Sequence, residues 1–491
     1  MSAKLERKQD SAVFLLFFFC LLLWAAYAIS ITLGDPSVFS LANKVLPSLL
    51  LLVLLGAGYW IVRRNSHLVW SPLPWFLGVC AVYYGFGPLQ YPFGTQESVW
   101  YADQFYPVGE HDLLRTNMLN TAGITLVLLG YQVGMALIPK QRAAYSTIFN
   151  IIEMKRLLFG LLVIGIPIKY LLVVPYRLGL LSYVLPGSIQ GLSIFTSLSI
   201  IVLFVMVHNG ANNYRILLYL LIAMELVTGL MSLSKLAVVM VLIMILLGIF
   251  FCRPRMNVFI TGITLIGLIY IVFLSSFVTY ARLAVRVGGL QSQEEFSTSI
   301  LEYAKEGRLD ALGQKPYVQD WWSRLNYANV QAFAMNSYDS GNPGDTYSLI
   351  PFTVVPRVLY PEKPIMSRGP EFNELITGSN NSASAPGLFG DAYWNGGWLY
   401  VILSCLYAGL VYAIFTNLSI RYIREWKLAY LPVAFIGIMM GMRPDEFFFS
   451  SFVGPSFEAI VLYIAIRYFI TPVLSAKKLV IDGFGQEMRR I

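Results

Sequence analysis

The chain has 491 residues, of which 57% are hydrophobic and only 13% are charged. A typical soluble chain is about 45–50% apolar and about 25% charged, so this composition excludes a soluble enzyme, a disordered regulator and a nucleic-acid-binding protein. The net charge of +8 requires no polyanionic partner, because membrane proteins collect Lys and Arg in their cytoplasmic loops. The composition therefore predicts an all-α integral membrane protein that crosses the bilayer many times.

Apolar runs long enough to cross the hydrocarbon core, roughly 20 residues each, occur twelve times along the chain. The predicted spans lie near 12–33, 45–62, 72–91, 118–138, 157–175, 190–208, 214–233, 236–252, 257–278, 396–417, 428–442 and 455–475. The first run follows basic residues and contains Ala26-Tyr27-Ala28, which resembles a signal-peptidase site. Because its apolar character continues to Leu33, we expect an uncleaved anchor.

The distribution of basic residues predicts the orientation of these spans. With a cytoplasmic N-terminus, 19 Lys and Arg fall in cytoplasmic segments and five fall in short external loops. Such a positive-inside bias survives only with an even number of spans, so both termini are expected in the cytoplasm.

The segment 279–395, between the ninth and tenth spans, is the longest stretch without a predicted span. It is too long for a plain connection. Its aromatic-rich, periodic pieces indicate a large external loop that carries short amphipathic helices. No repeat relates the two halves of the chain, and we treat residues 1–491 as a single transmembrane domain with this loop inserted.

Basic side chains gather on the predicted external side and are candidates for binding a phosphate. They lie outside the seventh and ninth spans, in the long loop and in the turn between the last two spans: Lys235, Arg282, Arg357, Lys363, Arg368 and Arg443. Guanidinium groups bind phosphate oxygens bidentately and Lys adds a point charge, which suits a lipid-linked diphosphate. An Arg at the end of a span can equally reach the headgroups, and Arg443 can form a local ion pair.

Acidic and aromatic residues accompany these bases. A diphosphate leaves readily once its charge is neutralised, and a nearby carboxylate can then deprotonate an acceptor hydroxyl. Asp391 and Glu371 are the candidate bases, while Trp394, Asn395 and Asp445 are candidate sugar contacts. The stretch that holds Asp391 and Trp394 can instead be a helix start with interfacial anchors.

Arg467 is predicted within the last span, where it can reach the inner headgroups. Lys169 and Glu225 are also predicted within spans. A charge in lipid costs about 2.5–3.5 kcal/mol even on permissive scales, so each should face protein or water. They can form a structural pair or a proton relay. With three scattered histidines and four cysteines that all lie in or beside apolar runs, no metal and no cofactor are predicted.

Three short motifs together resemble those of a known protein family. They are Ser232-Leu233-Ser234-Lys235, a basic segment at 356–368, and Phe389-Gly390-Asp391-Ala392-Tyr393-Trp394-Asn395-Gly396-Gly397-Trp398 at the entry to the tenth span. With them, the chain resembles the Wzy-type polymerases of O-antigen repeat units and, more distantly, the O-antigen ligases. The family often has Arg and Glu where this chain has Lys235 and Asp391; Lys keeps the charge but cannot reproduce a bidentate guanidinium.

The resemblance implies a GT-C-like glycosyltransferase of surface polysaccharide synthesis in the bacterial inner membrane. Such a polymerase joins oligosaccharide units carried on undecaprenyl diphosphate at the periplasmic face, without a nucleotide sugar. Lys235, Arg357 and Arg368 would hold the diphosphate, with Lys363 and Arg443 in support. Its implied partners are the lipid-linked oligosaccharide, membrane lipids and a chain-length regulator protein, with no nucleic acid.

Two alternatives remain open. A ligase that transfers glycan to lipid A is disfavoured, because segment 279–395 contains no histidine to match the loop histidine of ligases. A lipid-linked oligosaccharide flippase or secondary transporter also has about twelve spans. It is disfavoured because transporters usually show repeated halves.

Overall fold

The computed structural model describes residues 2–138, 150–177, 180–181, 185, 187–275, 277–278, 321–355, 360–364, 366–380 and 382–473, and these form helices and no strands. Ten of the described helices are long and apolar enough to cross a membrane, consistent with a multi-pass membrane protein. The chain forms two compact units. The first comprises Met1–Ile148 and Trp322–Thr471, and the second comprises Phe149–Trp321 and Pro472–Ile491.

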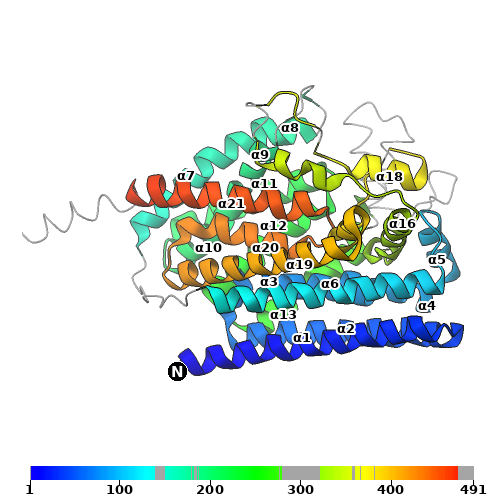
Figure 1. The fold of residues 1–491 in the computed structure, drawn as a ribbon. Coiled ribbons are helices and arrows are strands. Elements are labelled where there is room, and N and C mark those ends of the chain that lie inside the picture. Colours follow the sequence, from blue (N-terminus) through cyan, green and yellow to red (C-terminus); the bar gives the residue numbers. More distant parts are fainter. Residues whose placement is uncertain are drawn as a thin grey trace, which may run out of the picture. The chain divides into compact units, whose positions relative to one another are not determined.

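Long helices make up the frame of the first unit (Figure 1). These are α1 (Ser2–Leu33), α2 (Pro36–Arg64), α6 (Glu110–Leu137) and α19 (Gly387–Arg424). Shorter elements complete it: η1 (Ser66–Trp70), α3 (Pro72–Cys80), η2 (Ala81–Phe86), η3 (Gly87–Leu89), α4 (Gln90–Phe93), α5 (Gln96–Asp103), η8 (Ser323–Leu325), α16 (Ala328–Asp339), η9 (Thr346–Leu349), α17 (Ile350–Val354), α18 (Gly369–Thr377), η10 (Leu428–Tyr430), α20 (Leu431–Met442), η11 (Phe449–Val453), α21 (Gly454–Ala465) and η12 (Ile466–Ile470).

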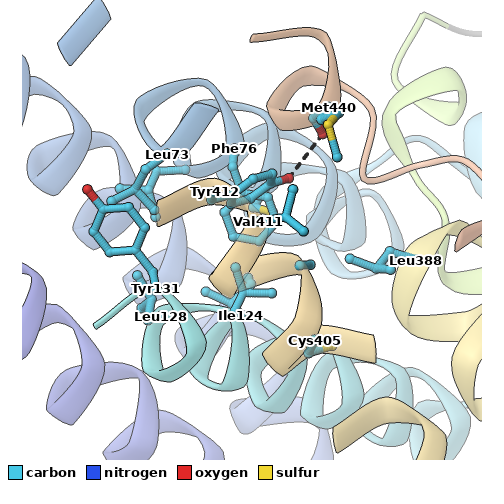
Figure 2. Close-up of a cluster of buried hydrophobic side chains, with 14 of the residues drawn as sticks. Leu73, Phe76, Ile124, Leu128, Tyr131, Leu388, Cys405, Val411, Tyr412 and Met440 are labelled. Atoms are coloured by element: carbon cyan, nitrogen blue, oxygen red, sulfur yellow. Dashed lines mark hydrogen bonds between the residues drawn. The ribbon is translucent and has the colours of Figure 1, made fainter. Parts of the chain in front are cut away.

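The core of the first unit is built where α6 and α19 pack together. A Cβ at Gly130 or at Gly409 would overlap the backbone of the opposite helix, so the two glycines permit a close approach. Apolar side chains of α3, α6 and α19 fill the space around this contact (Figure 2). Tyr412 is fully buried there, and its hydroxyl donates to the Met440 carbonyl at 3.0 Å. The Met440 carbonyl thus satisfies the buried Tyr412 hydroxyl.

Two predicted spans are shorter or less regular than the other ten. The third, near 72–91, is a succession of α3, η2, η3 and α4, and the eleventh is the 15-residue apolar stretch Leu428–Met442. The third follows η1, which packs on α19 near Arg424, and in its second half the Tyr84 ring lies 5.2 Å from the ring of Phe389 near the start of α19. The eleventh has Tyr430 stacked on Tyr422, with ring centroids 3.8 Å apart, and the Pro444 carbonyl after it accepts from Leu388 N–H at 2.8 Å. Each run therefore joins opposite ends of α19.

The second unit contains α7 (Ile151–Ile166), η4 (Pro167–Val173), α8 (Val174–Arg177), α9 (Gly187–Leu192), α10 (Ile194–His208), η5 (Asn212–Tyr214), α11 (Arg215–Met231), α12 (Lys235–Cys252), α13 (Met256–Ile269) and η6 (Tyr270–Leu274). Lys169 and Glu225, both predicted within spans, meet here. Glu225, which is buried, pairs with Lys169 and accepts hydrogen bonds from Ser197 and from the Tyr170 hydroxyl, the latter at 2.9 Å. Three helical segments are thus joined around one carboxylate.

Candidate functional site

The predicted site residues of the first unit gather at one end of that unit. α16 and α18 lie there, at the end opposite to the N-terminus of the chain (Figure 1). Phe372 of α18 contacts Trp394 of α19 and Phe447 of the turn after α20, with ring centroids 5.1 Å and 6.0 Å apart. We call Phe372, Trp394 and Phe447 the aromatic cluster. It brings three separately predicted stretches of sequence together.

Asp391 lies near the start of α19 and has no exposed surface. Its Oδ1 accepts from the Thr346 hydroxyl at 2.6 Å and from the Asn395 amide at 3.1 Å, and its Oδ2 accepts from Phe448 N–H at 2.9 Å. These bonds tie η9, the start of α19 and the 443–448 turn to one carboxylate. The geometry favours Asp391 as a positioning residue, because its oxygens are already occupied by the protein.

Asn395 extends the same network. Its amide donates to Thr346 Oγ1 at 2.7 Å and to the Asp391 carbonyl at 2.8 Å, and its Oδ1 accepts from Tyr347 N–H at 3.1 Å. All of the described bonds of this side chain are internal. Its contact with a sugar stays a prediction, and its geometry is that of a brace between α19 and η9.

Trp394 is only 7% exposed, and the structure places it in packing contacts. Its ring lies against Phe372 and Gly344, and its indole N–H donates to the Asn342 carbonyl at 3.3 Å. A stacking platform needs an open ring face. The described contacts therefore give Trp394 a role in the aromatic cluster rather than an open surface for a sugar.

Arg368 and Glu371 form the first charged group of the site. Arg368 pairs with Glu371 across the first turn of α18, and its Nη2 lies 3.7 Å from an oxygen of Asp345. The side chains of Glu371 and Asp345 are 51% and 72% exposed. The Arg368 Nε is buried and has no hydrogen-bond partner among the described residues. This guanidinium thus has one unused donor and two exchangeable partners.

The turn after α20 holds the second charged group. Arg443 pairs with Glu446 at 2.6 Å, and Asp445 accepts from the Tyr327 hydroxyl at 3.1 Å. Loss of hydration around Asp445, together with the nearby charge of Glu446, raises the pKa of this carboxyl to about 6. The Tyr84 hydroxyl donates to the Pro444 carbonyl at 2.8 Å and fixes the turn. Asp445 is partly exposed, accepts a hydrogen bond from Tyr327, and has a pKa close to neutral pH.

The other predicted basic residues give less information about a phosphate site. Lys363 donates to the Val355 carbonyl at 3.0 Å. Lys235 starts α12 in the second unit, where its ammonium lies 3.3 Å from Ser275 Oγ and 5.9 Å from the Tyr270 ring. Arg357 and Arg282 lie outside the described residues. A shared diphosphate site for Lys235, Arg357 and Arg368 therefore remains a prediction.

No motif marked Tyr327 or Thr346 as a residue of the site. Tyr327 lies in an aromatic-rich piece of the long segment and Thr346 begins the run Thr346-Tyr347-Ser348, and neither pattern indicates a hydrogen-bond partner. They matter because they donate to Asp445 and Asp391 from more than 40 positions away. Only the fold reveals such contacts.

Among the described residues, no group of three or more His, Cys, Asp or Glu side chains is placed to hold a metal ion. Comparison with protein families, with curated proteins and with solved structures yields no match for this chain.

Proposed function

We propose that the chain is a glycosyltransferase of the inner membrane that polymerises undecaprenyl-diphosphate-linked oligosaccharide units at the periplasmic face. The observation that carries this proposal is that the aromatic cluster joins α18, which carries Glu371 and follows Arg368, to the turn that carries Asp445. These residues come from stretches whose chemistry suits an anionic lipid donor and a hydroxyl acceptor. The resemblance of the sequence to Wzy-type polymerases supplies the substrate class.

Arg368 is the described residue best placed to hold the donor diphosphate. The side chains of Asp345 and Glu371 are more than half exposed, so either carboxylate can move into solvent when a phosphate takes its place on the guanidinium. The local sum of charges over these three residues is −1. A diphosphate therefore requires further cations, and Arg357, which lies outside the described residues, is our candidate from the sequence.

Asp445 and Glu371 are our candidates for the base that accepts the proton of the acceptor hydroxyl. Both are at least partly exposed, whereas the oxygens of Asp391 are enclosed by hydrogen bonds. A general base works best when its pKa lies near the working pH, which favours Asp445. Asp391 then acts indirectly, by holding the backbone of the turn that carries Asp445.

Reconstitution tests the proposal. The purified full chain in proteoliposomes, supplied with undecaprenyl-diphosphate-linked repeat units, should yield a ladder of longer glycans. The double substitution Arg357→Ala and Arg368→Ala should abolish the ladder while the protein still inserts. Arg324→Ala, which removes an exposed arginine of η8, is the matched control and should leave the ladder unchanged. No ladder with the natural sequence, or a normal ladder with the double variant, would refute the proposal.

A flippase or secondary transporter is the second candidate, and one observation favours it. The buried Lys169–Glu225 pair lies within candidate spans, and ionisable groups at such positions often mark transport pathways. The same proteoliposomes separate the two functions, because a flippase moves the repeat units across the bilayer without joining them. In cells, loss of a polymerase leaves single units on lipid A core, loss of a flippase strands units inside, and loss of a ligase leaves polymer on its carrier.

A further inference from the structure

A second polar cluster lies at the far end of α16 from Tyr327. Arg115, near the start of α6, donates from Nη1 to the Asn336 side-chain oxygen at 2.9 Å and pairs through Nη2 with Asp339. The Tyr393 hydroxyl of α19 donates to the other oxygen of Asp339 at 3.0 Å. Three helices, α6, α16 and α19, thus meet through one arginine and one carboxylate. Neither residue belongs to the site predicted from the sequence.

The polar groups of this cluster are fixed yet incompletely used. The side chains of Arg115 and Asp339 are 22% and 39% exposed. A guanidinium has five N–H donors and a carboxylate has about four acceptor positions, so each retains capacity towards solvent. Asn336 is also partly exposed, and its amide donates to the Tyr106 hydroxyl at 3.1 Å. Such planar groups match the paired donors and acceptors of adjacent sugar hydroxyls.

Aromatic rings flank the same groups. Tyr393 lies between Tyr338 and Trp398, with ring centroids 5.5 Å and 5.6 Å away and nearly perpendicular planes. Residues five apart on a regular helix point to different faces, so Tyr393 and Trp398 meet only because α19 is broken at Gly396 and Gly397. Tyr338 and Trp398 remain partly exposed. The cluster therefore combines fixed polar groups with aromatic edges or faces that can contact a pyranose ring.

We infer that Arg115, Asn336 and Asp339, with Trp398 and Tyr338, form a subsite for a sugar ring of the lipid-linked oligosaccharide. This rests on the proposed function. Tyr327, whose hydroxyl contacts Asp445, directly precedes α16, and Asp339 ends it, so the 12-residue helix places the backbones of Tyr327 and Asp339 about 18 Å apart. That separation suits an oligosaccharide whose reacting end lies at Asp445 and whose other end lies at Asp339.

The fixed ion pair at the subsite favours a sugar over a phosphate. Arg115 pairs with Asp339, and its Nη1 lies 3.9 Å from a carboxylate oxygen of Asp112. Asp339 is also held on its second oxygen by the Tyr393 hydroxyl, so this pair opens less readily than the pairs of Arg368. A phosphate would have to displace Asp339 from both partners, whereas sugar hydroxyls can use the donors and acceptors that remain.

Binding of the free oligosaccharide tests the inference without requiring catalysis. The probe is the repeat unit released from its carrier by mild acid, titrated into the purified full chain in detergent and followed by saturation-transfer NMR. Asp339→Asn and Trp398→Ala should each weaken binding about tenfold or more. Glu374→Gln, an exposed carboxylate on α18, should leave binding unchanged. Melting curves verify that the variants fold. The two substitutions act on different parts of the subsite, so a single folded variant is enough to test the inference.

Three outcomes would overturn the subsite: no binding by the natural sequence, equal binding by folded Asp339→Asn or Trp398→Ala, or displacement of the sugar by free pyrophosphate. The last result would instead identify an anion site. If only the proposed polymerase function is wrong, the result is different: the natural sequence would bind the oligosaccharide but produce no glycan ladder.

Discussion

Carboxylates near the aromatic cluster differ in their surroundings, and these differences separate their expected roles. Asp391 is enclosed, Glu371 is half exposed beside Arg368, and Asp445 is partly exposed beside Tyr327. A carboxylate whose oxygens are all bonded internally holds structure together, whereas one with free lone pairs can accept a proton. The sequence could identify all three as polar residues near the predicted outer face. It could not rank them, because their partners are distant in the chain.

The pH dependence of glycan extension should report on Asp445. Because its pKa is raised to about 6, the basic form is present above that pH, and kcat/KM should fall as the pH drops through 6. Tyr327→Phe removes a hydrogen bond that favours the carboxylate, so the acid limb should move up by about 0.4–1 pH unit. Glu446→Gln removes a neighbouring negative charge and should move the limb down. An acid limb that stays in place in both variants would exclude Asp445 as the base.

Asp391→Asn should destabilise the protein although it barely changes the shape of the side chain. An amide cannot accept from both the Thr346 hydroxyl and Phe448 N–H at these positions, and one buried donor left unpaired costs about 1–3 kcal/mol. The expected result is a lower melting temperature in detergent. Asp345→Asn is the control, since Asp345 is 72% exposed and should change stability by less than about 0.5 kcal/mol. Equal melting of the two variants would contradict the clamp role of Asp391.

At the scale of the element, α19 shows how the sequence prediction was close but incomplete. The tenth span was predicted to begin near 396, because apolar residues become continuous there. The structure starts the helix at Gly387 and breaks it at Gly396 and Gly397. The nine residues before the break are mostly buried and carry Asp391, Tyr393 and Trp394. Hydropathy marks the apolar part of α19, but only tertiary packing explains a buried helical segment ahead of it.

Substitution of Gly397 should disturb this break. Its φ of 58° and ψ of −150° lie in a region that only glycine adopts readily, and a Cβ there would lie 2.9 Å from the Tyr338 ring. Gly397→Ala should cost about 1–3 kcal/mol in backbone strain alone, with the ring contact in addition. It should lower the melting temperature and weaken oligosaccharide binding through the displaced Trp398.

Gly378→Ala provides the comparison for that experiment. Gly378 ends α18 with φ of 72° and ψ of 8°, and no atom lies within 4 Å of the position that a Cβ would take there. Its substitution carries only the cost of a left-handed residue, about 1–2 kcal/mol, and leaves oligosaccharide binding intact. If the two alanine variants behave alike in both measurements, the break in α19 has no special role.

For the whole molecule, the apolar runs were predictable and the assembly of the site was not. Each predicted span has a helical counterpart, because a membrane imposes a length and a composition that can be read locally. The contacts of Asp391 with Thr346 and Phe448, and of Tyr327 with Asp445, join positions from 45 to 118 residues apart. Local periodicity contains no information on such pairs. The sequence therefore predicted the stretches that contain the site residues but not how those residues contact one another.

The number of crossings depends on the two irregular runs, 72–93 and 428–442, and labelling can determine it. Each run joins opposite ends of α19, so we expect both to cross, and the proposed orientation then places Glu97 and Glu446 on the outer side. Glu97→Cys and Glu446→Cys, in a background without the partly exposed Cys252, should react with an impermeant maleimide added to intact spheroplasts. Arg63→Cys, at the end of α2, is the control expected on the inner side; it precedes both runs and should react only after lysis. Protection of Glu97→Cys would mean that 72–93 does not cross, and α6 would then run in the opposite direction through the bilayer. That result would also place Arg115 and Asp339 away from a periplasmic substrate, because they join α6 and α16 at this same end of the first unit.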